Sequence, residues 1–80
     1  MVIPLGALIR SAREERGWTL TELSRQAQVD HALVSRIESG QRTGSPATLH
    51  RLALALELDP ADVLAAAAQR VDTSSSDQAA

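Results

Sequence analysis

The sequence has no cysteine and no lysine, and Trp18 is its only aromatic residue. Without cysteine the chain can form neither disulfides nor thiolate metal sites, as is usual for a protein of the cytoplasm. No apolar run approaches the length needed to span a bilayer, and the N-terminal residues lack the basic cluster and cleavage site of a signal peptide. We therefore expect a cytoplasmic protein with no membrane contact. Trp18 directly precedes a predicted helix cap, so we interpret it as a structural contact and not as a platform for stacked bases.

Residues that would support catalysis are also scarce. The two histidines, His31 and His50, have no cysteine partner and do not form an HExxH motif. Glu14 and Glu15 are adjacent on a predicted helix, so their side chains point to different faces and cannot work as a carboxylate pair. There is no glycine-rich phosphate loop. At 80 residues the chain forms one small domain, and we expect no enzymatic activity, no metal site, no cofactor and no effector pocket.

The net charge of −2 argues mildly against nucleic acid, because phosphate binding depends on basic side chains. The charges are unevenly distributed, however. Between Ile9 and Arg42 there are six arginines and five acidic residues, a net charge of +1. From Thr43 onward there are two arginines and five acidic residues, a net charge of −3. Any basic face therefore belongs to the first half of the chain, and electrostatic binding should be modest.

Local signals predict two helices in the first third of the chain. The first runs from about residue 5 to residue 16, with one apolar stripe, and Gly17 ends it because glycine adopts the left-handed conformation without a Cβ clash. Thr19 and Glu22 form a capping box at the start of the second helix, 20–27. In such a box the Thr19 hydroxyl accepts from the Glu22 amide, and the Glu22 carboxylate reaches back to the cap.

The second helix is followed by a short turn and a third helix. Gln28 and Val29 form the turn, Asp30 is the next N-cap, and the helix over 31–39 ends at Gly40. Two short helices joined by such a turn make the unit that reads DNA in helix-turn-helix proteins. The sequence therefore predicts a helix-turn-helix from about Thr19 to Gly40.

Two prolines predict two further helices, because proline at the first helical position loses only an amide that has no helical partner. Pro46 opens the fourth helix and Pro60 the fifth. We therefore expect residues 1–70 to form an all-α, five-helix domain. The polar tail over 71–80 cannot bury apolar surface, and we expect it to be disordered.

The stretch from about Leu5 to Ala67 resembles the lambda-repressor-like (Cro/C1, XRE-type) helix-turn-helix family. The resemblance is carried by the segments 19–24 (TLTELS), 29–30 (VD) and 34–40 (VSRIESG), and SRIESG is the most specific part. It implies a five-helix fold with the helix-turn-helix at helices two and three. It also implies sequence-specific binding of double-stranded DNA, as in transcriptional regulators of bacteria and phages.

Two positions depart from the usual pattern of that family. Ser24 stands where the family generally has alanine, and serine is small enough to fit. Gln28 stands where glycine is usual in the turn. A left-handed backbone there costs a non-glycine residue about 1 kcal/mol. We expect replacement of Gln28 by glycine to raise thermal stability.

Residues on the outward face of the third helix are the candidates for reading bases. If Val34 and Ile37 face the core, the opposite side of the helix is free to enter a major groove. Arg36 is the strongest candidate, since a guanidinium can donate two hydrogen bonds to guanine. Ala32 offers a methyl surface to thymine. The alternative is a plain solvated face, and it stays most open for His31. The predicted base-reading residues are His31, Ala32, Ser35 and Arg36.

Phosphate contacts are expected on both sides of the reading helix. The start of the second helix presents its amides to the DNA backbone, although its threonines are equally explained as caps. The loop after the third helix resembles the phosphate-touching segment of the family, with a plain surface role as the alternative for Arg42. The resemblance also implies an ion pair between Arg13 and Glu38, which would orient Arg13 toward the backbone. The predicted phosphate contacts are Arg13, Thr19, Thr21, Ser39, Gln41, Arg42 and Thr43.

One recognition helix reads only a few base pairs, so we expect a homodimer on a palindromic operator. The fifth helix is the candidate interface, through Val63, Leu64 and Ala67. The predicted function is a nucleoid-associated repressor of its own or a neighbouring operon. The same fold also serves as the antitoxin of toxin–antitoxin pairs, so a DNA-binding antitoxin, or an interaction module that acts with a partner protein, remains the alternative.

Overall fold

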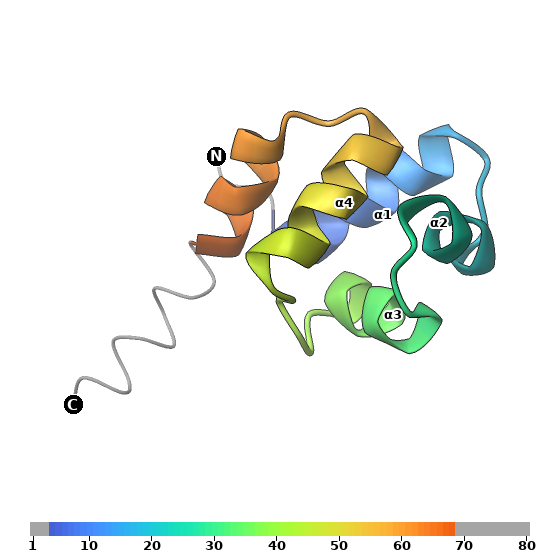
Figure 1. The fold of residues 1–80 in the computed structure, drawn as a ribbon, viewed down its shortest axis with the longest axis horizontal. Helices are drawn as coiled ribbons and strands as arrows, with labels where there is room; N and C mark the ends of the chain where they lie inside the picture. The colour runs from blue at the N-terminus through green and yellow to red at the C-terminus, as the bar shows by residue number, and fades with distance from the viewer. Residues whose placement is uncertain (1–3, 69–80) are drawn as a thin grey trace.

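The computed structural model describes residues 4–68, and this part of the chain is all-helical. The five-helix prediction is confirmed (Figure 1). The predicted tail, 71–80, and both ends of the predicted domain lie outside the described residues. The helices are α1 (Leu5–Glu15), α2 (Leu20–Ala27), α3 (His31–Ser39) and α4 (Pro46–Leu56), followed by a fifth helical segment, 60–68.

All five helices contribute to one apolar core. Both α3 and α4 pack against α1, and both also pack against α2. Burying each large aliphatic side chain contributes about 1.5–3 kcal/mol to folding. Because α1 and α2 cover one side of α3, its other side is left at the surface (Figure 1). The fully buried side chains at the centre are Ile9, Leu23, Val34, Ile37, Leu52 and Val63.

Polar side chains cap the starts of α2, α3 and α4, and the caps of α2 and α3 are those that the sequence predicts. The Thr19 hydroxyl accepts from the Glu22 amide at 3.1 Å at the start of α2. The Asp30 carboxylate accepts from the first-turn amides of α3 at 3.0 and 3.3 Å. The Ser45 hydroxyl accepts from the Thr48 amide at 3.2 Å at the start of α4. These contacts satisfy amides that have no partner within their own helix.

The second contact of the predicted capping box, from the Glu22 carboxylate back to the start of the helix, is replaced by other hydrogen bonds. The Glu22 carboxylate accepts from the Arg25 guanidinium at 2.8 Å and from the Gln26 amide at 2.7 Å, both further along α2. These hydrogen bonds, Arg25 first, lower the pKa of Glu22. Because the pKa is lowered in the folded state, these hydrogen bonds stabilise the fold at any pH above the ordinary pKa of the carboxyl. This stabilisation is lost as the pH falls through the lowered pKa. The expectation that Glu22 reaches back to the cap was therefore wrong, because partners one turn ahead compete for it.

Gly6 allows α1 to approach the end of α3 closely. A Cβ placed on Gly6 would lie 2.8 Å from the carbonyl oxygen of Ile37, which is closer than a carbon and an oxygen can pack. Any residue other than glycine would force the two helices apart. The sequence did not predict this close approach of α1 to α3, because a single glycine within a helix does not indicate which other helix packs against it.

The turn between α2 and α3 has the left-handed backbone that the sequence suggested. Gln28 adopts φ 57° and ψ 45°. The Ser24 hydroxyl donates to the Val29 carbonyl, and the Val29 amide donates back to the Ser24 carbonyl at 3.1 Å. The guanidinium of Arg51 on α4 donates to the Gln28 carbonyl at 3.4 Å. The Ser24 side chain therefore stabilises the turn, and the alanine that is usual in the resembled family could not make this hydrogen bond.

The fifth helical segment buries part of the predicted dimer interface. Val63 is fully buried and Ala67 is 4% exposed, both in the chain's own core. Leu64 is 41% exposed. This corrects the predicted interface, because a side chain covered by its own domain cannot contact a second copy. Of the three predicted residues, Leu64 remains available at the surface.

We predict that Gln28→Gly raises the melting temperature. Glycine relieves a left-handed strain of about 1 kcal/mol, which corresponds to about 4–8 °C for a domain of this size. Thermal unfolding followed by circular dichroism measures the change. Gln26→Gly is the matched control, because it introduces glycine within α2 and should lower the melting temperature. A lower melting temperature for Gln28→Gly would contradict the turn geometry.

Candidate nucleic-acid interface

The outward face of α3 presents most of the predicted base-reading side chains together. His31, Ala32 and Arg36 are exposed, and Ser35 is half-buried. Val34 and Ile37, on the opposite side, have no exposed surface. Residues four apart lie one above the other on a helix, so Ala32 and Arg36 share one stripe. The exposed face of α3 is therefore the part of the helix that is free to contact a partner.

The start of α2 carries two of the predicted phosphate contacts. Thr19 and Thr21 are both exposed. The Thr19 oxygen is used as the acceptor of the cap, at 3.1 Å from the Glu22 nitrogen. A hydroxyl is both a donor and an acceptor, so its proton remains able to bind a phosphate oxygen. Capping and phosphate binding are therefore compatible at Thr19.

The loop after α3 folds back onto the last turn of that helix. The Arg36 carbonyl accepts from the Gln41 amide at 2.8 Å and from the Arg42 amide at 3.2 Å. The side chains of Gln41 and Arg42 are exposed, whereas Thr43 is half-buried. The backbone bonds fix the loop, so residue Arg42 lies next to the C-terminal end of α3.

Ser39 differs from the other predicted phosphate contacts. It is exposed, but its hydroxyl donates to the Arg36 carbonyl at 3.1 Å. A phosphate oxygen is an acceptor only, so it needs that same proton. Ser39 would have to give up its intrahelical bond to bind phosphate, and we do not include it in the proposed interface.

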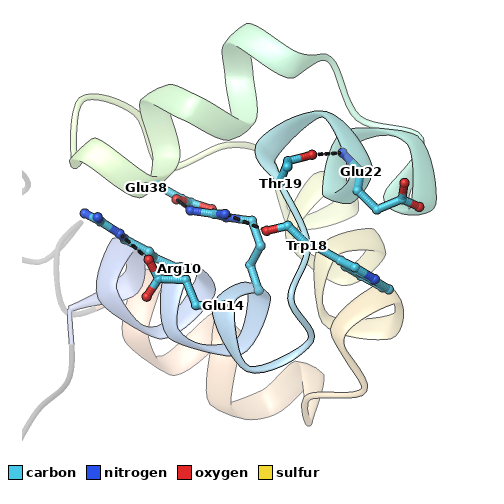
Figure 2. Close-up of polar contacts among 7 residues, drawn as sticks. Arg10, Glu14, Trp18, Thr19, Glu22 and Glu38 are labelled. Atoms are coloured by element: carbon cyan, nitrogen blue, oxygen red, sulfur yellow. Dashed lines mark hydrogen bonds and ion pairs between the residues drawn. The ribbon is translucent and has the colours of Figure 1, made fainter.

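Arg13 and Glu38 form a two-pronged ion pair between α1 and α3 (Figure 2). The guanidinium donates to the two carboxylate oxygens at 2.8 and 3.1 Å and to the Trp18 carbonyl at 2.8 Å. The side chains of the pair are only 12% and 8% exposed. Hydrogen bonding to Glu38 raises the pKa of Arg13.

The predicted contact of Arg13 with DNA stays a prediction. Three of the five guanidinium N–H groups donate to protein acceptors, and the side chain is nearly buried. These hydrogen bonds join Arg13 of α1 to α3 and to the segment that leads into α2.

A second arginine, not identified from the sequence, fixes the end of α1. The Arg16 guanidinium donates to the Leu56 carbonyl at 3.1 Å and pairs with Glu57 at 3.1 Å. Its charged carbon also lies 5.2 Å from the centre of the Trp18 ring. Trp18 is half-buried against the core, as its structural interpretation requires. Together these contacts join the ends of α1 and α4 and set the path into α2.

Comparison with known proteins settles the family. Residues 4–67 match a family model described as a helix-turn-helix domain. This chain belongs to the XRE-type helix-turn-helix family. The domain is 35% identical over 65 residues to an uncharacterised HTH-type transcriptional regulator, RghRB, and 43% identical over 54 residues to the HTH-type transcriptional repressor RghR, both of Bacillus subtilis (strain 168). These alignments cover 80% and 66% of this chain but 47% and 40% of the relatives, so the chain spans less than half their length.

Solved structures agree with this assignment of the helix-turn-helix domain. The restriction-modification controller protein C.AhdI from Aeromonas hydrophila superposes with a TM-score of 0.69 at 29% identity, over 74% of this chain and 89% of that one. The clp gene regulator ClgR from Corynebacterium glutamicum superposes with a TM-score of 0.68 at 34% identity, over 92% of this chain and 79% of that one. The domain is thus of the kind found in transcriptional regulators.

Two further findings concern the described part of the domain. Within residues 4–68, every helix is too short or too polar to cross a membrane. The same residues contain no group of three histidine, aspartate or glutamate side chains that could hold a metal ion.

We predict that Glu38→Gln lowers the free energy of unfolding by about 3 kcal/mol, because it leaves the Arg13 charge buried without its counter-charge. Chemical denaturation measures this loss. Glu14→Gln is the matched control, since it breaks the pair of Glu14 with Arg10, whose side chains are 56% and 64% exposed. The control should cost less than about 1 kcal/mol. Equal losses in the two variants would show that the buried pair has no special role.

Proposed function

We propose that this domain is a sequence-specific transcriptional regulator that binds double-stranded DNA with α3 in the major groove. The observation that supports the proposal most strongly is the exposed face of α3, on which Ala32 and Arg36 share a stripe. The buried pair of Arg13 and Glu38 holds the C-terminal end of that helix. A rigid helix with an exposed arginine is suited to reading base edges.

The proposed reading chemistry follows from the side chains on that face. Arg36 donates two hydrogen bonds to O6 and N7 of a guanine, and the Ala32 methyl packs against a thymine methyl. His31 and Ser35 lie on the same helix and contact a base or the adjacent backbone. Each good two-pronged contact discriminates between bases by about 1–3 kcal/mol. Arg36 therefore carries the largest share of the sequence preference.

The proposed phosphate contacts flank the reading helix. Thr19 and Thr21 bind on the side of α2, through hydroxyls and the helix N-terminus. Gln41, Arg42 and Thr43 bind on the side of the loop that follows α3. These contacts set the register of the protein on DNA but carry no sequence information themselves.

The proposal extends to a homodimer that binds a palindromic operator and represses transcription. Such a protein would be cytoplasmic and associated with the nucleoid through its DNA. One relative, RghR, is named as a repressor. A single copy of α3 spans too few base pairs for genomic specificity, so two copies on two half-sites are required. Leu64, the exposed member of the predicted interface, is our candidate contact between the copies.

The test is a titration of labelled DNA followed by fluorescence anisotropy. The duplex is one that the protein itself selects from a randomised pool, and a scrambled duplex of equal length is the reference. We predict that Arg36→Ala lowers affinity for the selected duplex by about tenfold or more and removes most of the preference. Arg51→Ala, which removes an exposed arginine from α4, should retain the preference.

Two results would contradict the proposal in different ways. Preferential binding that survives Arg36→Ala unchanged would show that α3 is not the reading element. Equal, weak binding of the wild-type protein to both duplexes would rule out a stand-alone regulator. An added partner protein that restores preferential binding in that case would establish the alternative, a DNA-binding module that acts only in a complex.

A further inference from the structure

A cavity of about 550 Å3 lies at the C-terminal end of α3, although the sequence suggested no pocket. Leu5 of α1, Ile37 of α3 and Ala66 of the fifth segment supply part of its apolar lining. Ser39 and Arg42, at the end of α3 and in the loop that follows, also line it. The cavity therefore adjoins the proposed DNA-binding surface through Arg42, one of the proposed phosphate contacts.

Two arginines from different elements line this cavity. Arg10 comes from α1 and Arg42 from the loop after α3, and both are exposed. Glu38 also lines the cavity, but its carboxylate is bound by Arg13 through two hydrogen bonds. The negative charge of Glu38 is thus neutralised by Arg13, and Arg10 and Arg42 leave a positive charge at the cavity. Sequence reasoning selected Arg42 but not Arg10, because only the close packing of α1 on α3 brings them to one cavity.

Arg10 forms a surface ion pair with Glu14 that a phosphate group could replace. Its guanidinium donates to the Glu14 carboxylate at 3.2 Å along the surface of α1 (Figure 2). The two side chains are 64% and 56% exposed, so solvent screens the pair and the net attraction is small. A phosphate oxygen can therefore replace Glu14 as the acceptor. A neighbouring acidic side chain also weakens the field that Arg10 presents to DNA.

We infer that Arg10, together with Arg42, binds the DNA backbone beyond the C-terminal end of α3, and that Glu14 competes for Arg10. This inference rests on the proposed function. The ligand is the phosphodiester backbone of duplex DNA, because Arg10 lines the same cavity as Arg42, which is one of the proposed phosphate contacts. The contact adds affinity for all sequences equally, since phosphates are common to every base pair.

The experiment measures the affinity of Arg10→Ala for the selected and the scrambled duplex over a range of salt concentrations. Loss of one phosphate contact should weaken binding about five- to tenfold at about 0.1 M salt, for each protomer bound, and reduce the salt slope by about 0.9. The ratio between the two duplexes should stay the same. Glu14→Gln, which frees Arg10, should strengthen binding to both duplexes.

Arg51→Ala is the control, because it removes the same charge from an exposed position on α4. It also removes the 3.4 Å hydrogen bond to the Gln28 carbonyl, so its melting temperature must match that of the wild-type protein. Equal affinity and salt slope for Arg10→Ala and Arg51→Ala, while Arg36→Ala loses the preference, would overturn this inference and leave the proposed function intact. Wild-type protein that shows no preference for its selected duplex would overturn the proposed function itself. Melting curves of each variant verify that the compared proteins are folded.

Discussion

The buried ion pair between Arg13 and Glu38 determines how the rest of the domain presents α3. One guanidinium connects three elements, because it binds the carboxylate on α3 and also the Trp18 carbonyl ahead of α2. The pair forms where Gly6 lets the backbones of α1 and α3 approach closely. Burying two charges costs much of the attraction that they gain. The main effect of the ion pair is therefore on geometry, since it fixes α3 against α1 and against the segment that leads into α2.

Much of the fold followed from local signals in the sequence. The predicted bounds of the second and third helices, 20–27 and 31–39, are those of α2 and α3, because their caps depend on residues within one turn. The left-handed backbone of Gln28 was suggested by the resemblance, because the family usually has glycine at that position of the turn. Such features can be predicted because the interacting groups are close in sequence.

Other features depend on neighbours that are distant in sequence. Gly6 packs against the end of α3, and Arg16 donates to a carbonyl at the end of α4. No local sequence pattern predicts either of these partners. Val63 and Ala67 belong to an alanine-rich helix, in which the sequence alone does not show which face is buried. The residues of the candidate site also differ in whether local sequence predicts them. Arg36 was predicted from helical periodicity, whereas Arg10 became a candidate only once the packing of α1 was known.

The charge distribution fits the proposed function if direct reading of bases contributes more than general electrostatic attraction. The net charge is −2, and two of the basic side chains, Arg13 and Arg16, are bound within the protein. The arginines left near the reading face are few, so each has a large influence on affinity and on its salt dependence. A weakly charged domain of this kind would discriminate between sequences mainly through α3.

Mapping the amide chemical shifts of the labelled protein on addition of its selected duplex tests the central claim most directly. The account predicts the largest changes over 19–21, 31–36 and 41–43, with small changes over α4 and the fifth helical segment. Large changes over α4 and 60–68, with α3 unaffected, would contradict it and would place the DNA-binding surface on another face of the domain.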